Sequence, residues 1–445
     1  MKRTITFTSI WDTWSWSPDL TRRNEGVQVD DGVSHKKVRK QERPRASEAA
    51  LQLAAIGLEA EFELLVDDRP VRPERIFPDP RAIVRDPMMH RVGRSYHLPT
   101  GSAIYFDTGV IELATPVIEI NRGCAARAGR SLWEAIVYLR NELDAWDRAN
   151  GKHTRLKGFS AHYNISFERQ RGTPARGRGV DELALLLSYI LPVPVMLLAA
   201  NRESTGIGVR PRENRIEVTA DFTPSPSLMI ATATFITGVV REVMTWPSFE
   251  LSVLRRRHVP VIRGFEPMPH TSRKGYLARL DRFPTNPFAA NIHVDSWPVE
   301  NAVAGGEAVS TMTLHEIGAS IFRRFRQAVL RLSDPFTFRM ISLIMNGKTS
   351  TLLDLPERPD AYEDVGHLCL WDDLFPERIL KRSIYERILI RAISGQKLRM
   401  NGDTYTPIGL RGWSEVVFRR DSDGRHRRVP FDLLRRYLEL WERVS

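Results

Sequence analysis

Four stretches of this chain alternate between apolar and polar residues, and this pattern constrains the fold more than any other feature of the sequence. Successive side chains of a β-strand point to opposite faces of a sheet, so each stretch presents one apolar and one polar face. Such strands suit an antiparallel sheet that packs helices on its apolar face and leaves its polar face available. The four stretches are GLEAEFELL (57–65), GSAIYFDTGVIELATPVIE (101–119), GFSAHYNISF (158–167) and RPRENRIEVTADF (210–222).

The polar faces of these strands carry a selected set of side chains. The first, third and fourth stretches contribute Glu59, Glu61 and Glu63, then Ser160, His162 and Asn164, then Arg215, Glu217, Thr219 and Asp221. Adjacent carboxylates repel one another unless cations lie among them. Hard divalent cations bind oxygen ligands, and arginines bind phosphates through paired hydrogen bonds. Each stretch alone also fits a solvated or salt-bridged strand, but the four together favour a site for Mg²⁺ and phosphate.

The second stretch needs one irregularity to fit this scheme. Tyr105 and Asp107 share a face, whereas Glu112 has the opposite parity if the strand is continuous. A bulge at Gly109 would insert one residue and bring Glu112 onto the face of Asp107, and we expect that bulge. The alternative is a strand that ends at Asp107, with this residue serving a turn.

The remaining pattern divides the chain into three parts. Residues 1–48 are basic and lack periodicity, which predicts a flexible tail; 49–332 form a catalytic domain and 333–445 a small C-terminal α/β domain. Helical spacing predicts helices at 130–150, 181–200, 225–247, 313–332, 334–346, 376–394 and 429–443, with a hairpin or small sheet at 398–420. We therefore predict an α+β fold with a curved, mostly antiparallel β-sheet. Its concave face is polar, and helices pack on its other face.

Composition limits the classes of function. The net charge of +11 over 445 residues favours anionic partners. Cys124 and Cys369 make neither a disulfide framework nor a zinc pattern, which suits a reducing, cytoplasmic location. The apolar run LALLLSYILPVPVMLLAA contains two prolines, so we expect core helices there and no membrane partner.

The order of the four motifs resembles that of the glutamine synthetase-like carboxylate–amine ligase superfamily. IGLEAEF resembles its first metal-binding strand, GFSAHYNIS its histidine strand, and NRIEVTADF the strand that completes its metal and phosphate sites. Glutamate–cysteine ligases share this general pattern. AIYFDTGVIELATP is closer to Pup ligases and Pup deamidases, which have a Tyr-x-Asp motif and then a glutamate spaced as Glu112 is from Asp107. The resemblance covers about residues 56–240, and the spacing from Glu112 to Glu119 departs from glutamine synthetase.

The resemblance implies a role for each matching residue. Asp107 would be the general base, and Arg215 would stabilise the phosphoryl group in transfer. The implied ligands of Mg²⁺ are Glu59, Glu61, Glu112, His162 and Glu217. The implied contacts with ATP are Arg210, Arg212, Arg215, Asn164 and Tyr105.

These roles imply a ligase that phosphorylates a substrate carboxylate with ATP and lets an amine attack the acyl phosphate. An acidic protein or a small protein modifier is one candidate for the carboxylate, and the acceptor amine is open. A deamidase on the same scaffold is an alternative, because Asp107 can also activate water. The third hypothesis is a non-enzymatic binder of an acidic protein or nucleic acid, which would use the basic segment 34–47 and the arginine-rich helix at 321–332. The nucleic acid is the less favoured of these two.

Overall fold

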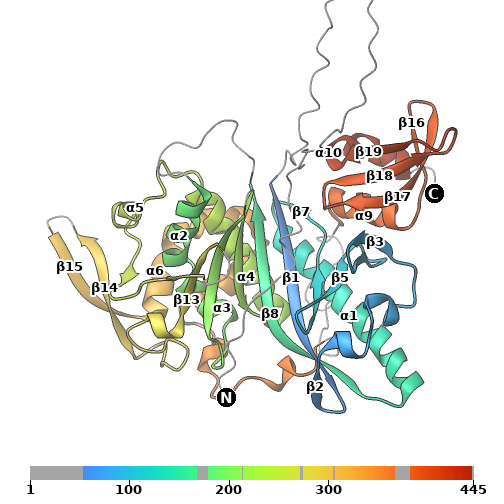
Figure 1. The fold of residues 1–445 in the computed structure, drawn as a ribbon. Coiled ribbons are helices and arrows are strands. Elements are labelled where there is room, and N and C mark those ends of the chain that lie inside the picture. Colours follow the sequence, from blue (N-terminus) through green and yellow to red (C-terminus); the bar gives the residue numbers. More distant parts are fainter. Residues whose placement is uncertain are drawn as a thin grey trace, which may run out of the picture.

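A sheet of twelve strands forms the centre of the molecule, as the computed structural model shows (Figure 1). The structure describes residues 54–167, 179–212, 214–270, 274–303, 306–365 and 381–442, so the predicted tail at 1–48 lies outside it. The strand order is β12-β13-β9-β10-β8-β1-β6-β5-β4-β3, and β2 and β7 also pair with β1. The strands are β1 (Ala55–Val66), β2 (Arg69–Val71), β3 (Met89–Val92), β4 (Ser95–His97), β5 (Ala103–Asp107), β6 (Val110–Ala114), β7 (Ile118–Glu119), β8 (Thr154–Ser166), β9 (Gly206–Arg212), β10 (Arg215–Asp221), β12 (Met268–Pro269) and β13 (Tyr276–Arg279).

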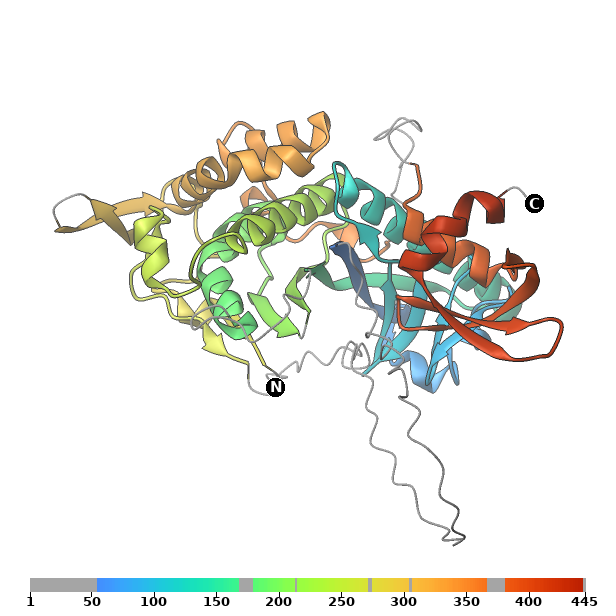
Figure 2. The ribbon, with the colours of Figure 1, turned by 90° about the horizontal axis from the view of Figure 1, so that it is seen from above.

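Helices cover one face of this sheet (Figure 2). Helices α1, α3 and α4 contact the central strands, and α6 and α7 pack on α4 from outside. The helices of this layer are α1 (Cys124–Asn150), α2 (Val180–Ile190), α3 (Pro192–Ala199), α4 (Pro226–Val243), α6 (Leu314–Leu332) and α7 (Pro335–Met345). A short helix, α5 (Ser252–Arg256), and a three-stranded sheet of β11 (Val261–Ile262), β14 (Ser296–Val303) and β15 (Gly306–Thr313) lie in the region expected to be mostly loop.

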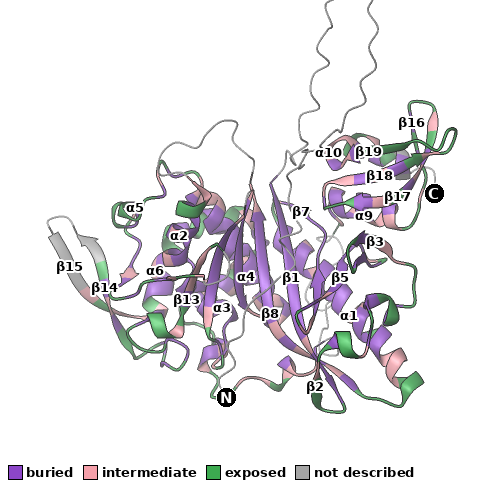
Figure 3. Cartoon of the chain, viewed as in Figure 1, coloured by how far each residue is buried: buried purple, intermediate pink, exposed green. Residues whose placement is uncertain are grey.

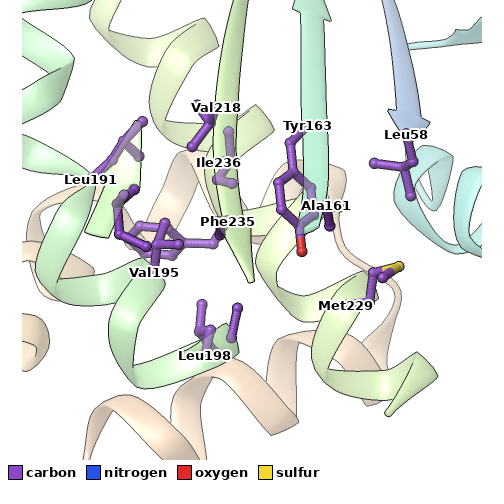
Figure 4. Packing of buried hydrophobic residues seen from close by; sticks show 14 of the residues in the cluster. Leu58, Ala161, Tyr163, Leu191, Val195, Leu198, Val218, Met229, Phe235 and Ile236 are labelled. Atoms are coloured by element: carbon purple, nitrogen blue, oxygen red, sulfur yellow. The ribbon is translucent and has the colours of Figure 1, made fainter. Parts of the chain in front are cut away.

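The apolar residues of the alternating strands form the main core. Leu58, Ala161, Tyr163 and Val218 point toward the helices, where they meet Phe235 and its neighbours on α4 (Figure 4). Every strand pairing in the described part of this sheet is antiparallel, and the predicted fold class is confirmed. The central strands are buried on both faces (Figure 3), so their polar side chains are also removed from water.

The second alternating stretch forms a hairpin, so the predicted bulge at Gly109 is wrong. Strands β5 and β6 are joined by the two-residue turn Thr108–Gly109, whose φ angles of 48° and 99° are those of a type I′ turn. Reversal of the chain places Glu112 directly opposite Tyr105. Glu112 therefore shares the face of Asp107, as expected, but a turn and not an inserted residue puts it there.

Two predicted helices are divided in the structure. The run at 181–200 breaks at Leu191, and α2 and α3 meet at 58° because Pro192 begins a new helix. The run at 429–443 becomes α10 (Phe431–Leu434) and α11 (Leu438–Glu442). No single described helix is long and apolar enough to cross a membrane, although the bent pair α2–α3 meets the same criterion by length and composition.

Residues 381–442 build a second, smaller apolar cluster beside the sheet. It contains helix α9 (Ile384–Ile393) and the four strands β16 (Leu398–Met400), β17 (Asp403–Arg411), β18 (Glu415–Arg420) and β19 (His426–Pro430). This second cluster also includes Ala103, Tyr105 and Ala114 of the large sheet. Helix α7 belongs to the main core, and the predicted division at residue 333 stays a prediction.

Candidate functional site

The antiparallel register brings acidic side chains from three strands together on the face that the helices leave uncovered. Glu61 on β1 lies opposite Glu112 on β6 and opposite Ser160 on β8. Glu59 lies two residues earlier on β1, opposite His162. These positions follow from the alternation, because residues two apart on a strand share a face. We call Glu59, Glu61, Asp107, Glu112 and His162 the carboxylate group.

Hydroxyl and imidazole groups hold the carboxylate group in place. The Tyr105 hydroxyl lies 2.7 Å from Glu112 Oε1 and 3.0 Å from Glu59 Oε1. The other oxygen of Glu59 lies 2.8 Å from His162 Nδ1, and Ser160 Oγ donates to Glu61 Oε2 at 2.6 Å. All three glutamates are at most 4% exposed, so their geometry is set by the protein and not by water.

Burial makes the charged form of these glutamates costly. It raises the pKa of Glu61 to about 7, and the nearby Asp107 adds to this rise, while the hydrogen bond from Ser160 opposes it. The pKa values of Glu59 and Glu112 are also raised well above the usual range, by burial and then by repulsion from neighbouring glutamates. A cation would relieve both the burial and the repulsion.

The arrangement of these side chains fits a hard divalent cation. Ligand atoms of Glu59, Glu112 and His162 lie within 4.8 Å of one another, and those of Glu61, Asp107 and Glu112 form a second such set. Glu112 belongs to both sets, and its Oε2 atom is buried without a hydrogen-bond partner in the described part of the chain. Buried polar atoms nearly always have a partner, so this oxygen is available to a metal ion.

A second group of residues lies next to the carboxylate group on the same face. Glu217 on β10 forms ion pairs with Arg210 and Arg212 on β9; the distance from Arg212 Nε to Glu217 Oε2 is 3.0 Å. Arg215 donates through Nε to Asn164 Oδ1 at 3.0 Å. We call Arg210, Arg212, Arg215, Glu217 and Asn164 the arginine group. It brings positive charge from two adjacent strands to one place.

The charges of the arginine group reverse the effect of burial on Glu217. Burial alone would raise its pKa, but Arg210 and Arg212, with smaller contributions from His162 and Arg215, lower that pKa below the usual range. Burial lowers the pKa of Arg215 to about 10, and attraction to Glu217 opposes this change. Glu217 is thus an ionised carboxylate at neutral pH.

The structure gathers the predicted site residues but gives them unequal surroundings. Glu59, Glu61, Glu112 and His162 lie in sets that could hold a metal, whereas Glu217 pairs with arginines and belongs to neither set among the described residues. Their roles stay predictions. Glu119, which follows in the same stretch, points away from the site and accepts a hydrogen bond from Tyr385 N at 3.0 Å.

Two contributors to the site were not predicted from the sequence. Ser160 shares the polar face with His162, which is the signal that could have identified it as the donor to Glu61. Arg91 on β3 lies 5.9 Å above the Tyr105 ring and 5.1 Å above the Trp413 ring, from guanidinium carbon to ring centre. No local pattern marks Arg91, because its neighbours His90 and Val92 are exposed and β3 is short.

Comparisons with known proteins add one structural similarity. No family model matches the chain, and no curated protein matches it. A chain in the crystal structure of the complex between Prokaryotic Ubiquitin-like Protein Pup and its Ligase PafA is similar in fold, with a TM-score of 0.46 and 12% sequence identity. The similarity covers 88% of this chain and 94% of that chain. At this level it carries no argument about activity, and we derive the function from the residues of the site.

Proposed function

We propose that this protein is an ATP- and Mg²⁺-dependent carboxylate–amine ligase that forms an amide or isopeptide bond. The observation that carries the proposal is the placement of the carboxylate group beside the arginine group on one buried sheet face. Strand β8 joins them, with His162 in the first and Asn164 in the second. A nucleotide triphosphate with its metal ions needs both kinds of group at short range.

The carboxylate group supplies oxygen and imidazole ligands. Glu59, Glu112 and His162 would hold one Mg²⁺, and Glu61 with Glu112 would hold a second. When bound, Mg²⁺ neutralises charge on the phosphates that the reaction transfers and releases. The protein's own contribution is to fix the ligand atoms, which Tyr105 and Ser160 do through the hydrogen bonds to the glutamates.

The arginine group would bind the phosphates themselves. Arg210 is 1% exposed, and its Nε and Nη1 atoms have no hydrogen-bond partner in the described residues, although its other nitrogen pairs with Glu217. Arg215 is held by Asn164. Guanidinium groups fixed in this way stabilise negative charge without having to reorganise during the reaction.

The proposed reaction has two steps. An oxygen of the substrate carboxylate attacks the γ-phosphorus of ATP, the bond to the β-phosphate oxygen breaks, and ADP leaves. The amine then attacks the acyl carbon, its surplus proton goes to Asp107, and the C–O bond to phosphate breaks. Asp107 ends β5 at the hairpin turn and is 7% exposed, which suits a base that must meet an incoming amine. The net charge of +11 favours an acidic carboxylate substrate, such as a glutamate-rich protein.

The proposal is tested by titrating ATP into the purified protein with and without Mg²⁺. We expect Mg²⁺-dependent binding that Glu59→Ala removes and that Glu119→Ala retains, since Glu119 lies outside the site. Absence of ATP binding in both metal conditions would overturn the proposal. Stoichiometric release of ADP with amide formation separates a ligase from a deamidase, which would cleave its substrate without net turnover of ATP.

A further inference from the structure

Tyr105 belongs to two parts of the molecule at once. Its ring is 1% exposed and packs in the second cluster with residues of the C-terminal domain, which here means 381–442. Its hydroxyl bonds to Glu59 and Glu112 of the carboxylate group. Any movement of the C-terminal domain against the sheet therefore reaches the carboxylates through one rigid side chain.

Arg91 connects the C-terminal domain to Tyr105 by a second route. Its guanidinium lies near the rings of Tyr105 and Trp413, and its Nη1 atom donates to Ser95 Oγ at 3.2 Å. Trp413 occupies the turn between β17 and β18, and the His97 ring stands edge-on to it at 4.9 Å. Trp413 is fully buried, so its indole fixes where the guanidinium can sit.

The charge of Arg91 acts on the carboxylate group. Burial lowers the pKa of this arginine, while attraction to Tyr105, Glu59 and Glu112 opposes the change. The interaction is mutual: a guanidinium held near two glutamates makes their charged forms less unfavourable. Losing Trp413 would loosen Arg91 and so alter the electrostatic potential at the ligand atoms.

The Tyr105 hydroxyl also decides which oxygens face a metal ion. It contacts Oε1 of Glu59 and Oε1 of Glu112, so Oε2 of Glu112 is left for a ligand. Groups that orient the ligands of a metal change its affinity about 10-fold to 100-fold when they are removed.

We infer that the C-terminal domain sets the divalent-cation affinity of the site through Trp413, Arg91 and Tyr105, which act as positioning residues. This inference rests on the proposed function only in that the carboxylate group binds a divalent cation. It does not require ATP, a ligase reaction or any particular substrate.

The test is titration of Mn²⁺ alone into the full chain, followed by calorimetry or by the electron paramagnetic resonance signal of free Mn²⁺. Tyr105→Phe, which keeps the ring and removes the hydroxyl, should weaken Mn²⁺ binding about 10-fold to 100-fold. Trp413→Phe should weaken it several-fold. The matched control is Trp441→Phe, because Trp441 is also buried in the second cluster, at 1% exposure, and packs on Phe418.

Combining the variants tests the connection itself. Residues that act on one another give non-additive effects, so Trp413→Phe should weaken Mn²⁺ binding less in the Tyr105→Phe background than in the wild type. Near-ultraviolet circular dichroism verifies that each variant is folded. Arg91→Lys, which keeps the charge but loses the planar stacking group, should resemble Trp413→Phe.

Three results would overturn the inference. These are a wild type that does not bind Mn²⁺, a folded Tyr105→Phe that binds it within twofold of wild type, and equal weakening by Trp413→Phe and Trp441→Phe. Failure of the proposed function looks different. A protein that binds Mn²⁺ with the expected variant effects, but does not bind ATP with Mg²⁺, would retain the inference and lose the ligase.

Discussion

Glu61 and Glu217 lie on the same sheet face, both buried, yet their surroundings push their pKa values in opposite directions. Burial raises the pKa of Glu61 to about 7, whereas Arg210 and Arg212 overcome the same effect and lower the pKa of Glu217. The protein thus contains its own counter-charge for Glu217 but has hydroxyls and an imidazole around the carboxylate group. The difference marks where an external cation is needed and where an external anion can be received.

The largest expected effect is on folding stability. Glu217→Gln leaves Arg210 and Arg212 without their carboxylate, and breaking a buried ion pair costs about 3 to 5 kcal/mol. Glu61→Gln keeps an oxygen for Ser160 and removes a charge that burial disfavours, so we expect metal-free stability within about 1 kcal/mol of wild type. Urea denaturation at pH 8 in the presence of a chelator measures both. Equal losses in the two variants would break the comparison.

The pH dependence of stability should also separate the two regions. Because the folded-state pKa of Glu61 is raised from 4.5 to about 7, its contribution to stability is full below pH 4.5 and is lost as pH rises toward 7. Metal-free wild type should therefore lose on the order of 3 kcal/mol relative to Glu61→Gln between pH 4.5 and 8. Denaturation curves across this range provide the measurement. A constant difference between the two proteins would contradict it.

Addition of a divalent cation should act on one region alone. Free Mg²⁺ at about one hundred times its Kd should stabilise the wild type by about 3 kcal/mol, measured as a shift in the denaturation midpoint. Glu112→Gln should abolish the shift, because Glu112 belongs to both candidate ligand sets. A shift of unchanged size in Glu112→Gln would place the cation elsewhere.

The smallest expected effect concerns a glutamate outside both groups. Glu119 accepts from a backbone N–H in the first turn of α9, and Glu119→Gln should reduce stability by about 0.5 to 1 kcal/mol. The Mg²⁺ response should be unchanged, and thermal unfolding with and without Mg²⁺ measures both quantities. A lost Mg²⁺ response would return Glu119 to the list of candidate ligands.

Alternation along single strands allowed much of the sheet to be predicted from the sequence. It assigned Leu58 and Tyr163 to the core and Glu59 and His162 to the polar face, because a period of two needs only local information. The turn at Thr108–Gly109 was missed, since the usual signals of a type I′ turn are Asn-Gly and Asp-Gly, and Thr rarely adopts a positive φ.

Contacts between distant segments could not be predicted in this way. Arg91 and Trp413 are brought together by packing of the C-terminal domain on the sheet, and neither lies in a motif with a characteristic spacing. The pairing of Glu217 with Arg210 and Arg212 also depends on the register of β9 with β10. The alternating pattern placed these residues on one face but did not reveal that the arginines would neutralise Glu217.

The shared position of Tyr105 also bears on how the molecule is made. Residues 103–114 leave the ribosome long before residues 384–441, yet side chains from both segments share the second cluster. Contacts between segments so far apart in sequence form slowly. Until they form, Tyr105 and its neighbours Ala103 and Ala114 present an uncovered apolar surface that invites aggregation. The nascent chain would therefore acquire an ordered carboxylate group only after its last strands have been synthesised and docked.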